Sequence, residues 1–293
     1  MKPERLVQLS FIKSLLISGL LVGAPVIGLE RWLKRQPSRW AQADRSVAGS
    51  ARLLLSSRST KIWHLKVPDK RFGGVSALAI DRGRLLAVTD SGVAIRFAAL
   101  PPRGREWIVE LHDLPAGPGV VYRKSGNDAE SLLADRHGRG WWVGYEQKHS
   151  LLLFDRDLKT LIEKVTLKAA WPANVGAEAL IINGRGRIAI LPEGGTGAIP
   201  SGTSDAVRLP DGRLALLVRW FSWRGFVSEI RIGSGGGRPA RAIRLDLGPL
   251  DNPEAIAAAP LANGGTRLWI ATDDNFRPWM RTLLVALDLP PGA

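Results

Sequence analysis

The chain has 293 residues, of which 45% are hydrophobic and 23% are charged, values typical of a globular protein with one large domain or two smaller ones. It contains no cysteine, which excludes disulfides, thiol catalysis and zinc sites with cysteine ligands. The formal net charge is +14, and half of this excess falls within residues 1–60, beside an apolar segment, which points to a membrane-related role for that region.

The N-terminal region carries the features of an export signal. Lys2 and Arg5 precede an apolar run over residues 14–29, which is short for a spanning helix, since such a helix needs about 20 residues. We expect residues 1–29 to be a signal peptide or an uncleaved membrane anchor, and residues 30–60 to be a basic linker. The protein would then be periplasmic, or anchored to the inner membrane and facing the periplasm, with membrane contact through this segment.

From residue 61 onward the sequence is typical of short β-strands. One unit recurs, consisting of a small or acidic residue, an apolar strand, a turn with glycine or asparagine, a second apolar strand and usually an acid. A spacing of about 50 residues between such units indicates a β-propeller, whose blades have four strands each. The five copies are Ser76–Asp90, Glu130–Glu146, Glu178–Glu193, Asp205–Trp220 and Glu254–Asp274.

The spacing of the units also predicts two details of the propeller. The third and fourth copies begin too close together for a full blade, so one blade is abbreviated. A strand over residues 62–67 would complete the last blade and close the ring. We therefore predict an all-β fold over residues 61–293, a β-propeller of five to six blades, with Trp141, Trp142 and Trp269 packed between blades.

Acids stand at both ends of the repeated unit. An antiparallel hairpin returns to its starting edge, so the first and last residues of each unit lie at the same end of a blade. If these hairpins are the inner strands, the acids converge on one mouth of the central channel. A bound cation would neutralise the combined charge of these acids. Because all the ligands would be oxygen atoms, the cation is predicted to be Ca²⁺ or Mg²⁺. The alternative is that each acid hydrogen-bonds backbone N–H groups of a neighbouring blade. The candidates are Asp90, Glu130, Glu146, Glu178, Glu193, Asp205, Glu254, Asp273 and Asp274.

Several segments of the chain share the pattern of a known family, and they are Asp128–Leu132, Asn174–Leu180, Asn252–Ile256, Leu268–Phe276 and Met280–Leu284. With these stretches the chain resembles, over about residues 70–290, the bacterial phytase-like propeller domain, a family also described as having the esterase-like activity of phytase. The resemblance implies an exported propeller that hydrolyses phosphoesters or carboxylesters.

The sequence departs from the family pattern at two places. The chain between the third and fourth units is short, covering only Gly194–Ser204. In addition, Val218 and Arg219 stand where the fourth hairpin of such domains usually ends on an acid followed by a basic residue. Both departures bear on whether the domain is catalytically competent.

Two functions of different classes follow. The first is a calcium-dependent hydrolase of a small ester or other anionic ligand, with the cation lowering the charge of the substrate while water attacks. The metal ligands would be Glu130, Glu178, Asp205, Glu254 and Asp274, and the catalytic or substrate-binding residues would be Glu146, Glu193, Asn275 and Arg281.

The second function is a non-catalytic, calcium-stabilised propeller that binds an envelope ligand or protein. A weaker third interpretation is a membrane-tethered scaffold whose basic linker docks on anionic lipid. The sequence has no Gly-x-Ser-x-Gly motif, no paired histidine spacing and no nucleic-acid-binding motif, so we expect neither a serine hydrolase nor a nucleic-acid partner. Nothing in the sequence defines the oligomeric state.

Overall fold

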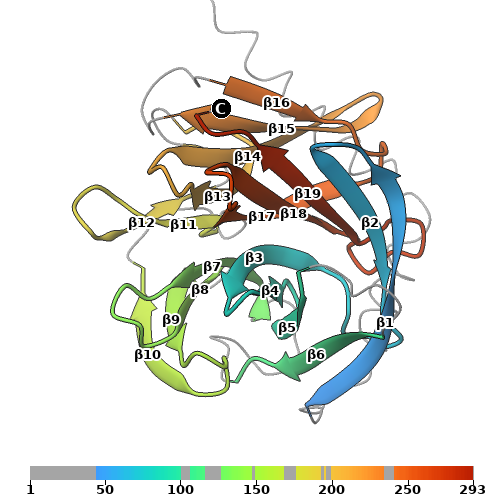
Figure 1. Ribbon diagram of the computed structural model, residues 1–293. Coiled ribbons are helices and arrows are strands. Elements are labelled where there is room, and N and C mark those ends of the chain that lie inside the picture. The colour runs from blue at the N-terminus through green and yellow to red at the C-terminus, as the bar shows by residue number, and fades with distance from the viewer. Residues whose placement is uncertain are drawn as a thin grey trace, which may run out of the picture. The chain divides into compact units, whose positions relative to one another are not determined.

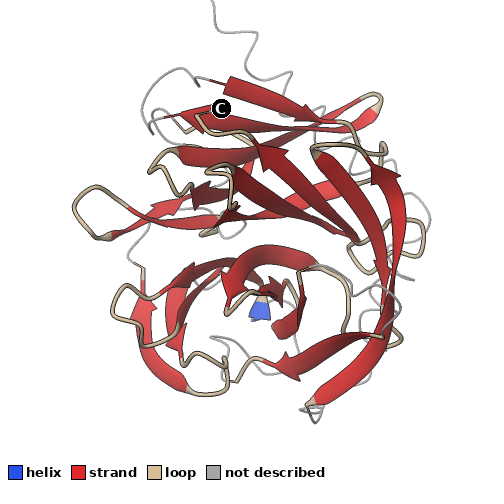
Figure 2. Cartoon of the chain, in the orientation of Figure 1, coloured by secondary structure: helices blue, strands red, loops and turns tan. Residues whose placement is uncertain are grey.

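Strands dominate the computed structural model, and the remaining described residues lie almost entirely in turns and loops (Figure 2). The structure describes residues 44–99, 106–115, 127–146, 149–167, 176–192, 195, 199–233 and 241–292. The chain divides into residues 1–41 and 42–293, and every described residue belongs to the second unit. Within the described part, no helix is long and apolar enough to cross a membrane. The apolar run over residues 14–29 lies outside it.

Three blades contain four consecutive antiparallel strands. Blade 1 comprises β3 (Val75–Asp81), β4 (Arg84–Thr89), β5 (Val93–Ala98) and β6 (Trp107–Asp113). Blade 2 comprises β7 (Ala129–Ala134), β8 (Trp141–Tyr145), β9 (Ser150–Phe154) and β10 (Leu161–Thr166). Blade 4 comprises β13 (Thr203–Arg208), β14 (Leu214–Ser222), β15 (Gly225–Gly233) and β16 (Arg241–Leu245).

The other two blades depart from this pattern in the predicted ways. Among the described residues, blade 3 is a two-stranded hairpin of β11 (Ala179–Ile182) and β12 (Ile188–Leu191), which is the abbreviated blade. The last blade takes its fourth strand from the beginning of the domain and comprises β17 (Asn252–Pro260), β18 (Thr266–Asp273), β19 (Leu283–Leu289) and β2 (Thr60–Lys66). The inner strands β3, β7, β11, β13 and β17 contact one another in a closed circle. The predicted propeller is therefore confirmed, with five blades.

One strand was not expected. Strand β1 (Arg45–Ser56) lies within residues 30–60, for which we expected a linker, and it pairs with β2 on one side and β6 on the other. It joins the last blade to blade 1 in a nine-stranded sheet (Figure 1). Val47 and Ala51 pack against the core between these two blades. In the sequence, the basic residues of this segment make the alternation of partly buried and exposed residues in β1 hard to recognise.

Apolar side chains fill the spaces between blades. Trp141 packs with blade 1 residues, and Trp142 packs with Leu180 of blade 3. Trp269 of the last blade lies in the core shared with blade 1, where its ring centroid is 6.2 Å from that of Trp63. These contacts agree with the packing expected for the three tryptophans. They fix each blade against the next, so side chains at the ends of the inner strands have defined positions.

A buried ion-pair network holds the segment that leads from β2 into β3. Arg71 is only 1% exposed. Its Nε and Nη2 donate to the two carboxylate oxygens of Asp69, each over 3.2 Å, and its Nη1 donates to Asp113 over 3.3 Å. Burial opposes the charge of Asp69, but the hydrogen bonds from Arg71 prevail and lower the pKa of its carboxyl group. The network joins the point where the ring closes to the outer strand of blade 1.

The inner strands share an irregularity that positions the site. In four blades the register between the first and second strands shifts by one residue close to the start of the inner strand, as in a β-bulge. Such a bulge re-aims the side chain of the extra residue. The extra residues are Ser76, Glu130, Ser204 and Glu254. Two of the four are predicted metal ligands, and Glu178 holds the corresponding place immediately before β11.

Candidate functional site: an acidic channel mouth

The second strands of blades 1, 2 and 4 each make an equivalent backbone hydrogen bond beside the bulge. The backbone N–H of Asp90 donates to Gly74 O over 2.9 Å, and that of Glu146 donates to Asp128 O over 3.0 Å. In blade 4 the same bond runs from Arg219 N to Gly202 O over 2.8 Å. These matching bonds show that Asp90, Glu146 and Arg219 occupy equivalent positions. Arg219 therefore brings a guanidinium to a place where two other blades have a carboxylate.

Three carboxylates of blade 2 form the tightest group. Asp128, Glu130 and Glu146 each offer an oxygen atom, and these atoms lie within 4.8 Å of one another. Asp128 and Glu130 come from the start of the inner strand, while Glu146 follows the end of β8. Carboxylate oxygens at this spacing are suited to a hard divalent cation such as Ca²⁺.

Glu130 also interacts electrostatically with acids of two other blades. Burial raises its pKa well above the usual value, and the charges of Glu178, Asp128 and Glu254 raise it further. A hydrogen bond with Asp128 acts in the same direction. The structure thus brings together Glu130, Glu178 and Glu254, three predicted metal ligands that lie far apart in the sequence. The group has more carboxylates than it can keep ionised without a nearby positive charge.

A second part of the mouth lies at the last blade. Burial raises the pKa of Asp273 well above its usual value, and the charges of Glu254, Asp90 and Asp274 add to this effect. Glu254 appears in both groups, so it links them. Arg219 supplies the positive charge here, because its Nη1 lies 3.0 Å from Glu254 Oε1 and donates to Asn252 Oδ1 over 2.5 Å.

Asp205 does not join this cluster. Its carboxylate accepts hydrogen bonds from Ile256 N over 2.8 Å and from Ala206 N over 2.7 Å, and no other carboxylate contributes to its pKa shift. The bulged residue equivalent to Glu130 is Ser204, so the fourth unit of the sequence was aligned one residue too late. Because a shift of one residue turns a side chain to the opposite face of a strand, Asp205 links two blades instead of facing the acids.

The remaining predicted residues have different surroundings. Asp274 accepts from Gly74 N over 3.0 Å and from the Thr282 hydroxyl over 2.8 Å, so it ties the last loop to the start of blade 1. The guanidinium of Arg281 pairs with Asp251, with Nε 3.0 Å from Oδ1. Asn275 is exposed, and its backbone N–H donates to Asp273 Oδ1 over 2.6 Å. Glu193 lies outside the described residues.

Sequence reasoning missed two residues of the cluster. Asp128 was considered only as part of the segment Asp128–Leu132 that resembles the family. Its position two residues before Glu130 places both carboxylates at the start of the inner strand β7. Arg219 was noted only as a departure from the family pattern. The available signal was its position in the fourth hairpin, which corresponds to that of Asp90 and Glu146 in other units, although β14 continues to Ser222.

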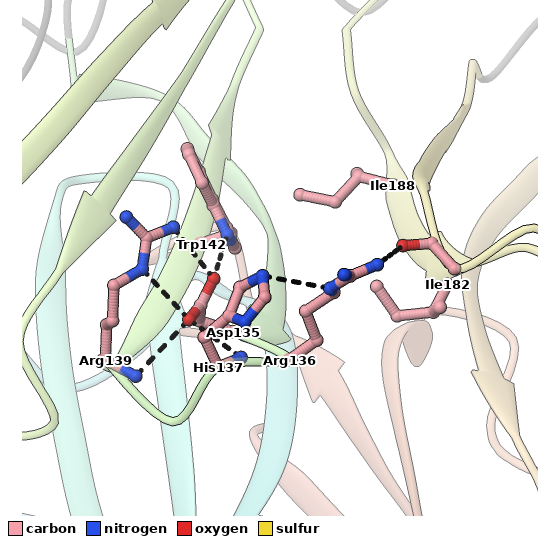
Figure 3. Close-up of a pocket in the computed structure, with 8 residues that line it drawn as sticks. Asp135, Arg136, His137, Arg139, Trp142, Ile182 and Ile188 are labelled. Atoms are coloured by element: carbon pink, nitrogen blue, oxygen red, sulfur yellow. Dashed lines mark hydrogen bonds and ion pairs between the residues drawn. The ribbon is translucent and has the colours of Figure 1, made fainter.

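Another recess lies at the opposite ends of the strands, where blade 2 meets blade 3. It has a volume of about 180 Å³ and its side chains largely bind one another (Figure 3). Arg136 Nη1 donates to Gly186 O over 2.6 Å, and Arg139 pairs with Asp135 over 3.1 Å. We interpret this arrangement as a structural contact that holds blade 2 against blade 3. The lining residues are Asp135, Arg136, His137, Arg139, Trp142, Ile182, Gly186 and Ile188.

We expect the pH dependence of stability to reveal the buried carboxyl group of Asp205. Burial raises its pKa well above the usual value, while the two backbone N–H groups partly oppose the shift. A raised folded-state pKa contributes stability below the unfolded pKa of about 3.9, and this is lost as the pH rises through the folded pKa. The free energy of unfolding of Asp205→Asn, measured with urea, should therefore improve relative to wild type between pH 5 and pH 8.

Asp135→Asn is the matched control for this measurement. Hydrogen bonds from Arg139 and Trp142 lower the pKa of Asp135, so this carboxyl group is ionised in both the folded and unfolded states between pH 5 and pH 8. Replacing Asp135 should destabilise the protein by the same amount at pH 5 and at pH 8. A difference between Asp205→Asn and wild type that stays constant with pH would contradict the expectation.

The geometry defines a five-bladed β-propeller with a carboxylate-rich mouth. Residues 70–203 match the family model described as "Phytase-like: Esterase-like activity of phytase". The resemblance found in the sequence is therefore confirmed over this part of the chain. No curated protein matches the sequence.

Several solved structures are similar at low identity. Hydrazine synthase from Kuenenia stuttgartiensis has 14% identity and a TM-score of 0.36, with 71% of this chain and 58% of that chain covered. The periplasmic gluconolactonase of Pseudomonas aeruginosa has 13% identity, a TM-score of 0.36 and coverages of 79% and 80%. The WD40 domain of Neurospora crassa Pan2 has 10% identity, a TM-score of 0.37 and coverages of 75% and 91%. The chain thus spans less than two thirds of the hydrazine synthase chain.

Proposed function

We propose that this protein is a phytase-like propeller that binds a divalent cation, calcium by preference, at its acidic mouth and hydrolyses phosphate or other esters there. The observation that carries the proposal is the surroundings of Glu130, whose pKa is raised by burial and by the carboxylates of two other blades. A bound cation would allow these groups to ionise together. The ligands are oxygen atoms only, which suits calcium, since this ion takes six to eight of them.

The proposed cation site is centred on blade 2. Asp128, Glu130 and Glu146 would hold the ion, and Glu178 would approach from blade 3. A bound calcium ion would supply a Lewis acid that lowers the charge on a substrate oxygen. Arg219, which lies among the acids of the mouth, would bind the anionic part of the substrate through its planar guanidinium, in exchange for part of its pairing with Glu254. Asp273, with its raised pKa, can hold a proton at the same mouth.

The proposal includes export. Residues 1–29 have the basic start and apolar run of a signal peptide or anchor. A periplasmic location, free or anchored to the inner membrane, supports access to extracellular esters. Mass determination of the mature protein would distinguish cleavage from anchoring.

A non-catalytic propeller is the second candidate function. It is favoured by the pairing of Arg219 with Glu254, because this guanidinium neutralises part of the mouth permanently. The acids would then hold a structural ion or bind a basic ligand of the envelope. This version predicts calcium binding without turnover.

One assay distinguishes the two. Hydrolysis of a chromogenic phosphomonoester and a chromogenic carboxylester is measured with calcium and with chelator, for the full chain and for Glu178→Gln, which removes a carboxylate of the proposed cation site. Glu163→Gln is the matched control, since Glu163 lies on the exposed strand β10 and pairs with Arg139. Calcium-dependent turnover that Glu178→Gln abolishes and Glu163→Gln retains supports the hydrolase. Calcium binding without turnover supports the second candidate, and the absence of both refutes the two together.

A further inference from the structure

The hairpin of β14 and β15 extends beyond the rest of its blade. Both strands have nine residues, whereas the inner strand β13 has six. Strand β14 pairs with β13 only as far as Val218, and the residues from Trp220 to Ser222 pair only with β15 among the described residues. Because Arg219 belongs to the acidic mouth, the end of this hairpin projects from the mouth side of the propeller.

The projecting end carries large aromatic side chains on both faces. Trp220 and Phe221 are adjacent in a strand, so they point to opposite faces, and both are exposed. Trp223, in the turn, is 87% exposed. Phe221 is held by an edge-to-face contact with Phe226 on the facing strand, with ring centroids 5.3 Å apart. The aromatic surface is therefore supported by the hairpin itself.

Neighbouring segments continue this surface. Phe226 N donates to Pro249 O over 2.9 Å, which brings exposed Leu250 beside the hairpin. The next residue, Asp251, pairs with Arg281 in the loop between β18 and β19. The same loop contains Trp279, which is 62% exposed. Together these residues form what we name the aromatic rim, defined as Trp220, Phe221, Trp223, Leu250 and Trp279. It contains every strongly exposed Trp and Phe of the described part of the chain.

The charge of the rim is positive. The guanidinium carbon of Arg224 lies 4.5 Å from the ring centroid of Trp223, and that of Arg277 lies 5.6 Å from the ring centroid of Trp279. Both arginines are exposed, and neither residues 219–226 nor residues 275–281 contain an acid. Exposed tryptophans with arginines stacked on them suit a partner that has an apolar interior and an anionic surface.

We propose that the aromatic rim docks on the surface of a membrane that contains anionic phospholipid. Tryptophan favours the headgroup level of a bilayer, and arginine is attracted to anionic lipid. Because the hairpin end is apolar on both faces, it is best buried by apolar surroundings that contact both faces. The interfacial region of a bilayer provides them, whereas a flat protein surface covers only one face. Docking through the rim turns the acidic mouth toward the membrane, so the ligands that reach it come from the membrane surface.

The chain has no cysteine, which makes a single fluorescent label straightforward. We would replace Ser222 by cysteine in the full chain, attach an environment-sensitive fluorophore, and add vesicles of phosphatidylcholine with or without phosphatidylglycerol. The expected result is a blue shift with the anionic vesicles alone. The control label is at Ile162→Cys, an exposed apolar position on β10, which should remain in water. This reading reports the depth of the hairpin itself, whether or not residues 14–29 also hold the chain on the vesicle.

Variants then test the two parts of the rim. Phe221→Ser combined with Trp223→Ser should lower the fraction of label in the bilayer by roughly tenfold, because the apolar area is lost. Arg224→Gln should weaken the preference for anionic vesicles severalfold, whereas Arg185→Gln, with the same charge change at the opposite end of the strands, should not. A label at residue 222 that stays in water while the chain is on vesicles overturns the proposal. So does a blue shift that rises with protein concentration without lipid, which would indicate self-association.

Discussion

The proposed cation site implies that replacing Glu130 by glutamine will lower the affinity of the propeller for calcium by roughly 100-fold or more, since loss of a direct ligand should cost at least as much as loss of an outer partner. In the calcium-free protein the same change will be stabilising. Glu130 lies among Asp128, Glu178 and Glu254, whose charges and burial raise its pKa. A neutral amide of nearly the same shape removes this repulsion. Isothermal titration calorimetry with Ca²⁺ and thermal unfolding in chelator measure the two effects.

The melting temperatures should move in opposite directions. In chelator, each 1 kcal/mol gained corresponds to a rise of about 2–4 °C for a domain of this size. With excess calcium, the variant should melt below wild type, because a ligand stabilises the folded state by mass action. Glu163→Gln, an exposed and paired glutamate on β10, should leave both values unchanged. If Glu130→Gln bound calcium as wild type does, the proposed cation site would be wrong.

Replacing Arg71 by methionine will destabilise the folded protein by about 3–5 kcal/mol, because removing one partner of a buried ion pair leaves the other charge uncompensated. The group left behind is Asp69, whose side chain is 3% exposed and accepts hydrogen bonds from the Arg71 side chain at both oxygens. Its remaining cationic partner would be the exposed Arg45, 4.0 Å away. The free energy of unfolding, measured with urea at neutral pH, tests this expectation.

A second variant distinguishes loss of the charge from loss of packing. Combining Arg71→Met with Asp69→Asn should restore part of the stability, because the orphaned carboxylate is removed. The loss in Arg71→Met alone should also diminish toward pH 4, where Asp69 can take up a proton in the variant. If Arg71→Met cost no more than an ordinary surface substitution, the network would have no part in closing the ring.

The repeated hairpins made most of the fold predictable. Glycine turns between apolar runs define paired strands locally, and their spacing sets the number of blades, including the two-stranded β11–β12 hairpin. Strand β1 forms a local hairpin with β2, but its pairing with β6 is long-range, and the basic composition of residues 30–60 led us to expect a linker. Composition describes the solvent-facing side of such a strand better than its role in a sheet.

The site was predictable only in part, and for a geometric reason. Glu130 and Glu254 stand at bulges, and a bulge changes which side chains face the mouth without leaving a clear mark on the sequence. That is how Asp205 was placed among the ligands when Ser204 holds the equivalent position. Arg281 was expected to face a substrate, but its partner Asp251 is 30 residues away, and pairing at that separation requires the folded arrangement.

Strand β1 has a consequence for how the domain bears mechanical load. Its hydrogen bonds run to β2 over one edge and to β6 over the other, and both ladders are antiparallel. A force applied at Arg45 along the strand direction would act in shear, so the bonds of both ladders would resist together instead of opening one after another. Single-molecule extension from Arg45 should therefore rupture at higher force than extension from the hairpin of β14 and β15.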